Sequence, residues 1–145
     1  NNYANFNCMT EQLTQHSWGL RMLFPVFALT GLKFVFPQLV AFPIYITKTE
    51  LNTLTIIYDA FYDFGVVGVL GFGIVLGVVC AYMTRKIKKN KNPIVYLFYG
   101  QIAMYLVLSF FSTWFSIPTT WFWFAVTAFL YLIVEKGSRK KIVLL

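Results

Sequence analysis

The sequence predicts an all-α fold: a polytopic membrane helical bundle with three clear transmembrane helices, preceded by an external segment that holds interfacial or re-entrant helices. Of the 145 residues, 59% are hydrophobic and only 12% are charged, whereas a soluble domain carries about 25% charged residues. The apolar residues gather in three segments, and the basic residues gather beside them. Together these patterns indicate a chain that crosses a membrane several times.

Residues 1–64 are expected to form the external segment. The stretch 1–17 is polar, and the apolar stretch 18–46 is interrupted by two cations and three prolines. These interruptions disfavour one straight spanning helix, so short helices lying in the interface or dipping back out of the membrane are predicted, with a fourth span as the alternative. Residues 47–63 are predicted to be a polar loop ending at the corner Asp63-Phe64-Gly65.

Residues 65–145 are expected to form the three-span membrane region, with spans at Val66–Met83, Ile94–Phe111 and Trp121–Val134. The first two segments have 18 residues and the third has 14, against the roughly 20 residues that cross a hydrocarbon core. The third span is therefore expected to include part of the preceding turn. Three spans alone make a thin bundle, so the chain is expected to be the C-terminal fragment of a larger membrane domain.

The distribution of basic residues predicts the orientation. Five cations occupy residues 85–91 and four occupy residues 136–141, against three in residues 1–64. Short segments rich in Lys and Arg remain in the cytoplasm, so the basic loop 85–91 and the C-terminal tail are predicted to be cytoplasmic. Membrane lipid is an expected partner. Nucleic acid is not, because no basic face is interleaved with exposed aromatic residues.

The two cysteines, Cys8 and Cys80, are expected on opposite sides of the membrane, which disfavours a disulfide between them. The Cys and His spacings that are typical of metal sites do not occur in the sequence. Neither a metal site nor a cofactor is predicted.

Asp63 stands at the entrance of the first predicted span, where an acid is costly unless it has a use. Asp59 lies four residues earlier, so on a helical turn the two acids would share a face. One interpretation is a catalytic or substrate-orienting carboxylate flanked by Tyr58 and Tyr62. The sequence alone favours a simpler one, in which the acid caps the N-terminus of the following helix.

Arg21 and His16 flank the tripeptide Ser17-Trp18-Gly19. Arginine binds phosphate through a planar fork of donors, and histidine exchanges a proton near neutral pH. An enzyme that uses a lipid pyrophosphate at the outer face needs both properties. The alternative is an arginine that snorkels at the interface, together with an ordinary loop histidine.

Two motifs resemble elements of a known family. The segment Asn52-Thr53-Leu54-Thr55, followed by Tyr58 and by Tyr62-Asp63-Phe64-Gly65, resembles the C-terminal signature of the O-antigen and capsular polysaccharide polymerases, which join oligosaccharide repeat units. The upstream residues His16–Gly19, with Phe24-Pro25, resemble an element that precedes this signature in the same family.

The resemblance covers about residues 1–83, and the last two predicted spans match only in hydropathy. Leu54 stands where an aromatic residue is common, and the many spans that precede this part of a complete polymerase are not in the printed sequence.

The resemblance implies a multi-pass glycosyltransferase of cell-envelope biosynthesis in the bacterial cytoplasmic (inner) membrane. It would transfer a growing glycan from polyprenyl (undecaprenyl) pyrophosphate to a sugar hydroxyl of a second lipid-linked repeat unit. The polyprenyl-pyrophosphate-linked oligosaccharide is the implied substrate, and flippase and chain-length regulator proteins are the implied partners.

The same resemblance implies roles for individual residues. Arg21, and after it Lys33, would bind the pyrophosphate leaving group, while His16 or Asp63 would be the base for the acceptor hydroxyl. The implied catalytic residues are thus Arg21, His16 and Asp63, and the implied substrate-binding residues are Lys33, Asn52, Tyr58 and Tyr62.

Two other functions remain open at the level of sequence. A non-enzymatic transporter or flippase subunit would couple Asp63 to the movement of protons or substrate. A structural membrane subunit would have no site of its own, and both Arg21 and Asp63 would tolerate substitution.

Overall fold

The computed structural model describes residues 2–48, 50, 53–89 and 92–143, and all regular structure in these residues is helical. The longer helices are α1 (Asn2–Gln12), α4 (Tyr58–Lys89), α5 (Ile94–Val107) and α6 (Pro118–Val143). The short elements are α2 (Phe24–Leu29), α3 (Leu32–Val35) and the 3-10 turns η1 (Pro37–Leu39) and η2 (Trp114–Ser116). The all-α prediction is confirmed.

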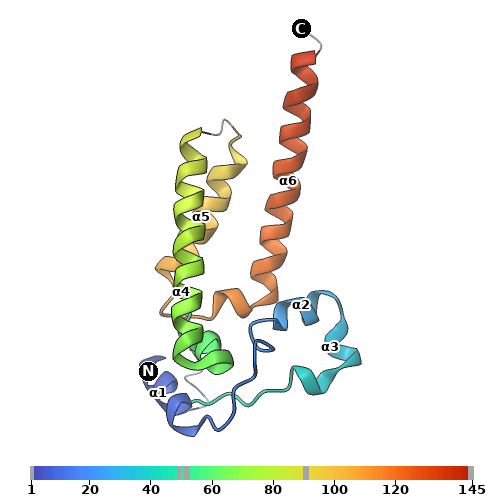
Figure 1. Ribbon diagram of the computed structural model, residues 1–145. Coiled ribbons are helices and arrows are strands. Elements are labelled where there is room, and N and C mark those ends of the chain that lie inside the picture. Colours follow the sequence, from blue (N-terminus) through green and yellow to red (C-terminus); the bar gives the residue numbers. More distant parts are fainter. Residues whose placement is uncertain (1, 49, 51–52, 90–91, 144–145) are drawn as a thin grey trace.

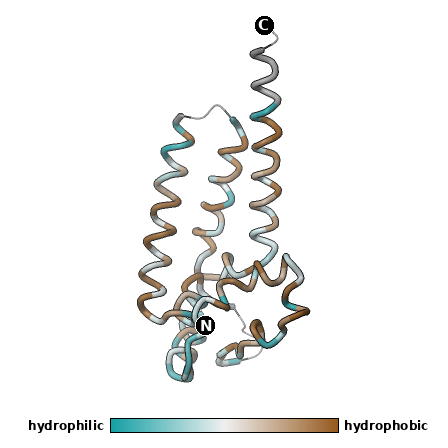
Figure 2. The backbone as a smooth tube through the Cα atoms, turned by 45° about the vertical axis from the view of Figure 1, so that its right-hand side comes forward, coloured by the Kyte–Doolittle hydropathy of each residue, from teal (hydrophilic) through white to brown (hydrophobic). Residues whose placement is uncertain are grey.

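Helices α4, α5 and α6 lie side by side, with α5 between the other two, and α1, α2 and α3 gather at one end of them (Figure 1). Hydrophobic residues run along all three long helices (Figure 2). Many of these apolar side chains point outward; for example, Val67 is 77% exposed and Ile74 is 68% exposed. Helices that are apolar on their outer faces are suited to lipid or to further helices rather than to water.

Two helices are long and apolar enough to cross a membrane, by length and composition. They are Tyr58–Lys88 within α4 and Pro118–Lys136 within α6. Both extend beyond the predicted first and third spans, Val66–Met83 and Trp121–Val134. The third span does include part of the preceding turn, since α6 begins at Pro118.

The second predicted span, Ile94–Phe111, is too long, because α5 ends at Val107. After Val107 the backbone tightens into shorter turns: Ser109 N donates to Leu106 O at 3.1 Å, and Phe111 N donates to Leu108 O at 3.0 Å. A 14-residue helix rises about 21 Å, which is short of a core of about 30 Å. The prediction of three clear spans is therefore not confirmed.

A sharp kink at Gly65 divides α4 into the segments 58–64 and 66–89. Gly65 has φ 62° and ψ −146°, a conformation that only glycine adopts readily. Next to the kink, a Cβ on Gly68 would overlap the carbonyl oxygen of Ala60 and lie 2.8 Å from Phe64 Cβ. Two glycines thus allow the segment 58–64 to pack closely against the start of the apolar segment.

The predicted corner at Asp63-Phe64-Gly65 is present, but the prediction of a loop over residues 47–63 is wrong for residues 58–63, which are helical. Burial explains the difference. Tyr58 and Tyr62, one helical turn apart, are 0% and 3% exposed and pack with Met9 of α1. The packing of these side chains stabilises a helix that the polar sequence around them does not suggest.

Helix α1 was not predicted, and it is held by polar as well as apolar contacts. Its buried Asn5 donates to Thr53 O at 3.0 Å and accepts from the backbone N–H of Thr47 at 3.0 Å and from its hydroxyl at 2.9 Å. Met9, one turn further along α1, packs with Tyr58 and Tyr62. The segment before α4 is therefore fixed to α1 at both of its ends.

The stretch 18–46 forms short helices, as predicted, and the alternative of a fourth span is wrong. Its longest helix, α2, has six residues and begins with Pro25 in its first turn. Gly31, with φ 77°, turns the chain into α3, and Pro37 begins η1 after α3 ends. These breaks agree with the proline and glycine positions in the sequence.

Candidate functional site

The candidate site begins with the 16–22 turn, the segment His16–Met22, which lies against the end of the segment 58–64. Ser17 N donates to Tyr62 O at 3.4 Å, and Trp18 N donates to Asp63 O at 3.2 Å. Two positive φ angles, 51° at Trp18 and 93° at Gly19, bend the turn around the helix end. The two sequence motifs that carried the family resemblance are thus in direct contact.

Asp63 is the anchor of this turn. Its carboxylate, which is 0% exposed, accepts from the Ser17 hydroxyl, from Arg21 N at 3.2 Å and from Met22 N at 2.8 Å. The simpler interpretation of the sequence made Asp63 a cap of its own helix. In the structure the acid instead binds free backbone N–H groups of a segment more than 40 residues away.

We expect Asp63→Asn to destabilise the fold by about 2 kcal/mol, because hydrogen bonds to a charged group contribute about 1.5–3 kcal/mol. An amide retains one acceptor oxygen and replaces the other with a donor, which would face N–H or O–H groups. Thermal unfolding in detergent measures this loss. The matched control is Glu11→Gln, which makes the same chemical change at an exposed side chain that accepts a hydrogen bond from Asn7; equal unfolding temperatures for the two variants would contradict the anchoring role.

Arg21 lies at the centre of the site, between aromatic rings and a carboxylate. Its guanidinium carbon lies 4.6 Å from the ring centre of Tyr62 and 5.1 Å from that of Tyr58. Its Nε donates to Asp59 Oδ1, and the two side chains are only 12% and 4% exposed. Tyr58 is itself fixed, since its hydroxyl exchanges hydrogen bonds with Tyr45 N at 3.0 Å and Tyr45 O at 3.1 Å.

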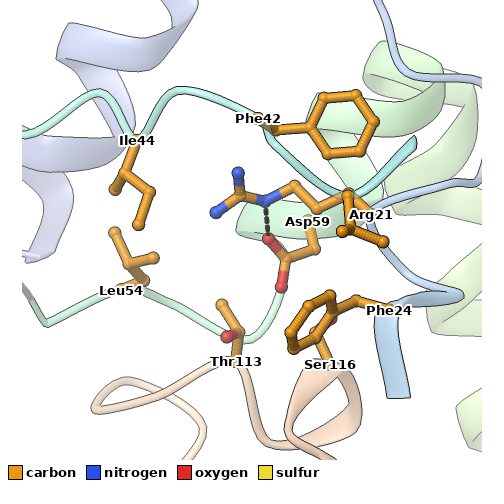
Figure 3. Close-up of a pocket in the computed structure, with 9 residues that line it drawn as sticks. Arg21, Phe24, Phe42, Ile44, Leu54, Asp59, Thr113 and Ser116 are labelled. Atoms are coloured by element: carbon orange, nitrogen blue, oxygen red, sulfur yellow. Dashed lines mark hydrogen bonds and ion pairs between the residues drawn. The ribbon is translucent and has the colours of Figure 1, made fainter. Parts of the chain in front are cut away.

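Arg21 and Asp59 line a cavity of about 260 Å³, which we call the Arg21 cavity. Figure 3 shows the two terminal nitrogens of Arg21 directed into it, toward Ile44 and Leu54. Among the residues that the structure describes, neither nitrogen has a hydrogen-bond partner. The remaining lining residues come from three further parts of the chain: Phe24, Val40 with Phe42, and Thr113 with Ser116.

The arrangement presents three kinds of groups to a ligand. The guanidinium offers the outer edge of its planar fork, which suits a phosphate or carboxylate. Asp59 offers its second oxygen, which lies on the side of Thr113 and Ser116 (Figure 3). Phe24 and Phe42 provide apolar walls. Such a mixture of apolar walls and few converging polar groups is typical of a binding site for a small polar ligand.

The structure brings some of the predicted residues together and separates others. Tyr58 and Tyr62 lie behind Arg21 and hold it, and neither lines the Arg21 cavity. His16 is exposed outside the cavity, with Nδ1 3.1 Å from Tyr62 O and its ring against Gly65. Lys33 lies on α3, with Nζ 4.9 Å from the ring centre of Phe34. Asn52 lies outside the described residues.

Asp59 is the residue that sequence reasoning underrated. Its spacing of four from Asp63 predicted a shared face, and both acids do bind the 16–22 turn. Only the structure shows that Asp59 reaches the cavity while Asp63 is enclosed. No sequence signal marked the contributions of Thr113 and Ser116, which come from the connection between α5 and α6.

Searches against protein-family models, curated proteins and solved structures find no match. In the part of the chain that the structure describes, no group of three His, Cys, Asp or Glu side chains is arranged to hold a metal ion. Cys8 and Cys80 are both free.

Proposed function

We propose that this chain is part of a membrane glycosyltransferase that polymerises lipid-linked oligosaccharide repeat units at the outer face of the cytoplasmic membrane. The observation that carries the proposal is the guanidinium of Arg21, whose inner edge binds Asp59 while its outer edge faces the Arg21 cavity. The likeness of the surrounding residues to the polymerase motifs supports it.

In the proposed reaction, Arg21 binds the pyrophosphate of a polyprenyl-linked glycan. The acceptor hydroxyl oxygen attacks the anomeric carbon, the bond from that carbon to the pyrophosphate oxygen breaks, and the pyrophosphate leaves with the electron pair. Donors aimed at the developing charge on a leaving group accelerate such a step. Because Asp59 fixes the plane of the guanidinium, its terminal N–H groups are already oriented before the substrate binds.

The carboxylate of Asp59 is the base in this scheme, a role that the sequence assigned to His16 or Asp63. Asp59 lines the cavity, while Asp63 is bound by three donors and His16 lies outside. The proton of the acceptor hydroxyl moves to the second oxygen of Asp59, the one that does not bind Arg21. Phe24 and Phe42 provide flat apolar faces against which a sugar ring can lie.

The proposed orientation places the Arg21 cavity outside the cell. Arg85, Lys86 and Lys88 lie near the far end of α4, about 30 Å from Gly65 by the rise of a helix. Because short basic segments remain cytoplasmic, the opposite end of the bundle, where α2 lies (Figure 1), is the outward end in this proposal. The Arg21 cavity, which Phe24 of α2 lines, faces outward with it.

Deletion of the gene in its own host tests this function, because that host makes the repeat unit on which the protein would act. We expect surface glycan to change from a ladder of lengths to single repeat units, and reintroduction of the gene to restore the ladder on a gel. A transporter would give a different result, with lipid-linked repeat units retained at the cytoplasmic face and no single repeats at the surface. An unchanged ladder in the deleted strain would reject the proposal.

A further inference from the structure

A second, apolar cavity lies within the helical bundle. It measures about 450 Å³, and its walls come from all three long helices, including Phe72, Leu76 and Val79 of α4, Phe98 and Ile102 of α5, and Phe124 of α6. We call it the bundle groove. Its lining is almost entirely hydrocarbon, so water gains little by entering it.

Consecutive residues line the bundle groove and the Arg21 cavity at two places along the chain. Met22 lines the groove, and the preceding residue, Arg21, lines the cavity. In the same way, Phe115 lines the groove and Ser116 lines the cavity. A ligand with a polar head and an apolar chain could therefore occupy both spaces at once.

The size of the groove indicates the kind of apolar occupant. The groove volume of about 450 Å³ lies within the range of about 300–1,000 Å³ that is common for small-molecule sites. A single flexible hydrocarbon chain fits this space.

We infer that the bundle groove binds the first part of a polyprenyl chain whose phosphate is held by Arg21. The inference rests on the proposed function, because that function supplies the polyprenyl phosphate head group. It adds that this protein selects its substrate partly through the chain, with α4, α5 and α6 forming the walls of the lipid site. Burial of the isoprene units removes apolar surface from water, which favours binding.

The test is photo-crosslinking of the purified full-length protein in nanodiscs with a polyprenyl phosphate that carries a diazirine in its chain. We expect mass spectrometry to find the label on peptides that contain Phe72 or Phe98. An excess of unlabelled polyprenyl phosphate should displace it, and an equal excess of phosphatidylglycerol should not. Equal displacement by the two lipids would show ordinary bilayer lipid in the groove and overturn the inference.

Leu76→Trp fills the groove and should lower specific labelling about tenfold, because the larger side chain occupies the space that the lipid chain needs. Leu70→Trp is the matched control, because Leu70 is 63% exposed and lies outside the groove. Val79→Trp with its control Val78→Trp repeats the comparison, in case the first variant unfolds. Equal labelling of filled and control variants that both fold would reject the groove as the binding site.

The outcome is separable from that of the proposed function, because binding is measured without turnover. A labelled groove in a protein whose deletion leaves the surface glycan unchanged would reject the polymerase and retain the lipid site. A ladder that depends on the protein, together with unaltered labelling in both filled variants, would reject only the lipid site.

Discussion

Arg21→Met is expected to lower polymer formation by about 100-fold or more, the usual cost of removing a donor that stabilises developing charge. Methionine keeps much of the length of the side chain and can still lie on Tyr58 and Tyr62, so the rings retain their packing. It provides no N–H group for the ligand. Gel analysis of surface glycan, at matched protein levels in membranes, gives the measurement.

The single variant also leaves Asp59 nearly buried without its partner, which is expected to cost about 3–5 kcal/mol of stability. The double variant Arg21→Met/Asp59→Leu separates the two effects. Replacement of a whole buried ion pair by apolar residues is often neutral, so the double variant should unfold near the temperature of the parent and still make no polymer. Recovery of the ladder in the double variant would show that the pair serves only the fold.

Gly68→Ala is expected to destabilise the protein by about 3 kcal/mol, near the upper end of the usual cost of overpacking. The added methyl group would meet the backbone carbonyl of Ala60, which cannot move aside as a flexible side chain can. Relief of the overlap requires the segment 58–64 to move away from the apolar segment, and Asp59 and Asp63 would move with it. Loss of stability and loss of polymer should therefore appear together.

Gly71→Ala is the matched control, because a Cβ at Gly71 meets no atom within 4 Å. Alanine is favoured over glycine inside a helix by about 1 kcal/mol, so this variant should be unchanged or slightly stabilised. Thermal unfolding followed by circular dichroism in detergent compares the two. If the Gly68→Ala protein is as stable as the Gly71→Ala protein, the close packing at the kink does not require a glycine at position 68.

The prediction of the fold succeeded where local chemistry decides the structure. Gly65 forms the predicted corner, and the prolines of the stretch 18–46 break it into short helices. It failed where contacts distant in sequence decide. Helix α1 and the segment 58–64 stabilise each other through Met9 and the tyrosines, and α5 ends where Ser109 O accepts from Ile56 N in a distant part of the chain.

The candidate site likewise has features that local sequence predicts and features that depend on contacts distant in sequence. The spacing of Asp59 and Asp63 predicted a common face. Arg21, which the resemblance made the principal cation, does line a cavity, and its role there stays a prediction. The pairing of Arg21 with Asp59 spans 38 positions, and no periodicity relates residues so far apart. Which acid is enclosed and which reaches the cavity depends on how the 16–22 turn lies on α4.

The connection from the 16–22 turn to α2 has a consequence for biogenesis. The turn binds α4 through Asp63, and α2 packs against α6, so one early segment of the chain joins the first and the last of the three long helices (Figure 1). During synthesis this segment leaves the ribosome well before α6 does. The walls of the Arg21 cavity all lie at or before Ser116, but α2 has no α6 to pack against until the last helix has been made. A chain interrupted before Pro118 would therefore carry the wall residues without the contact that fixes α2.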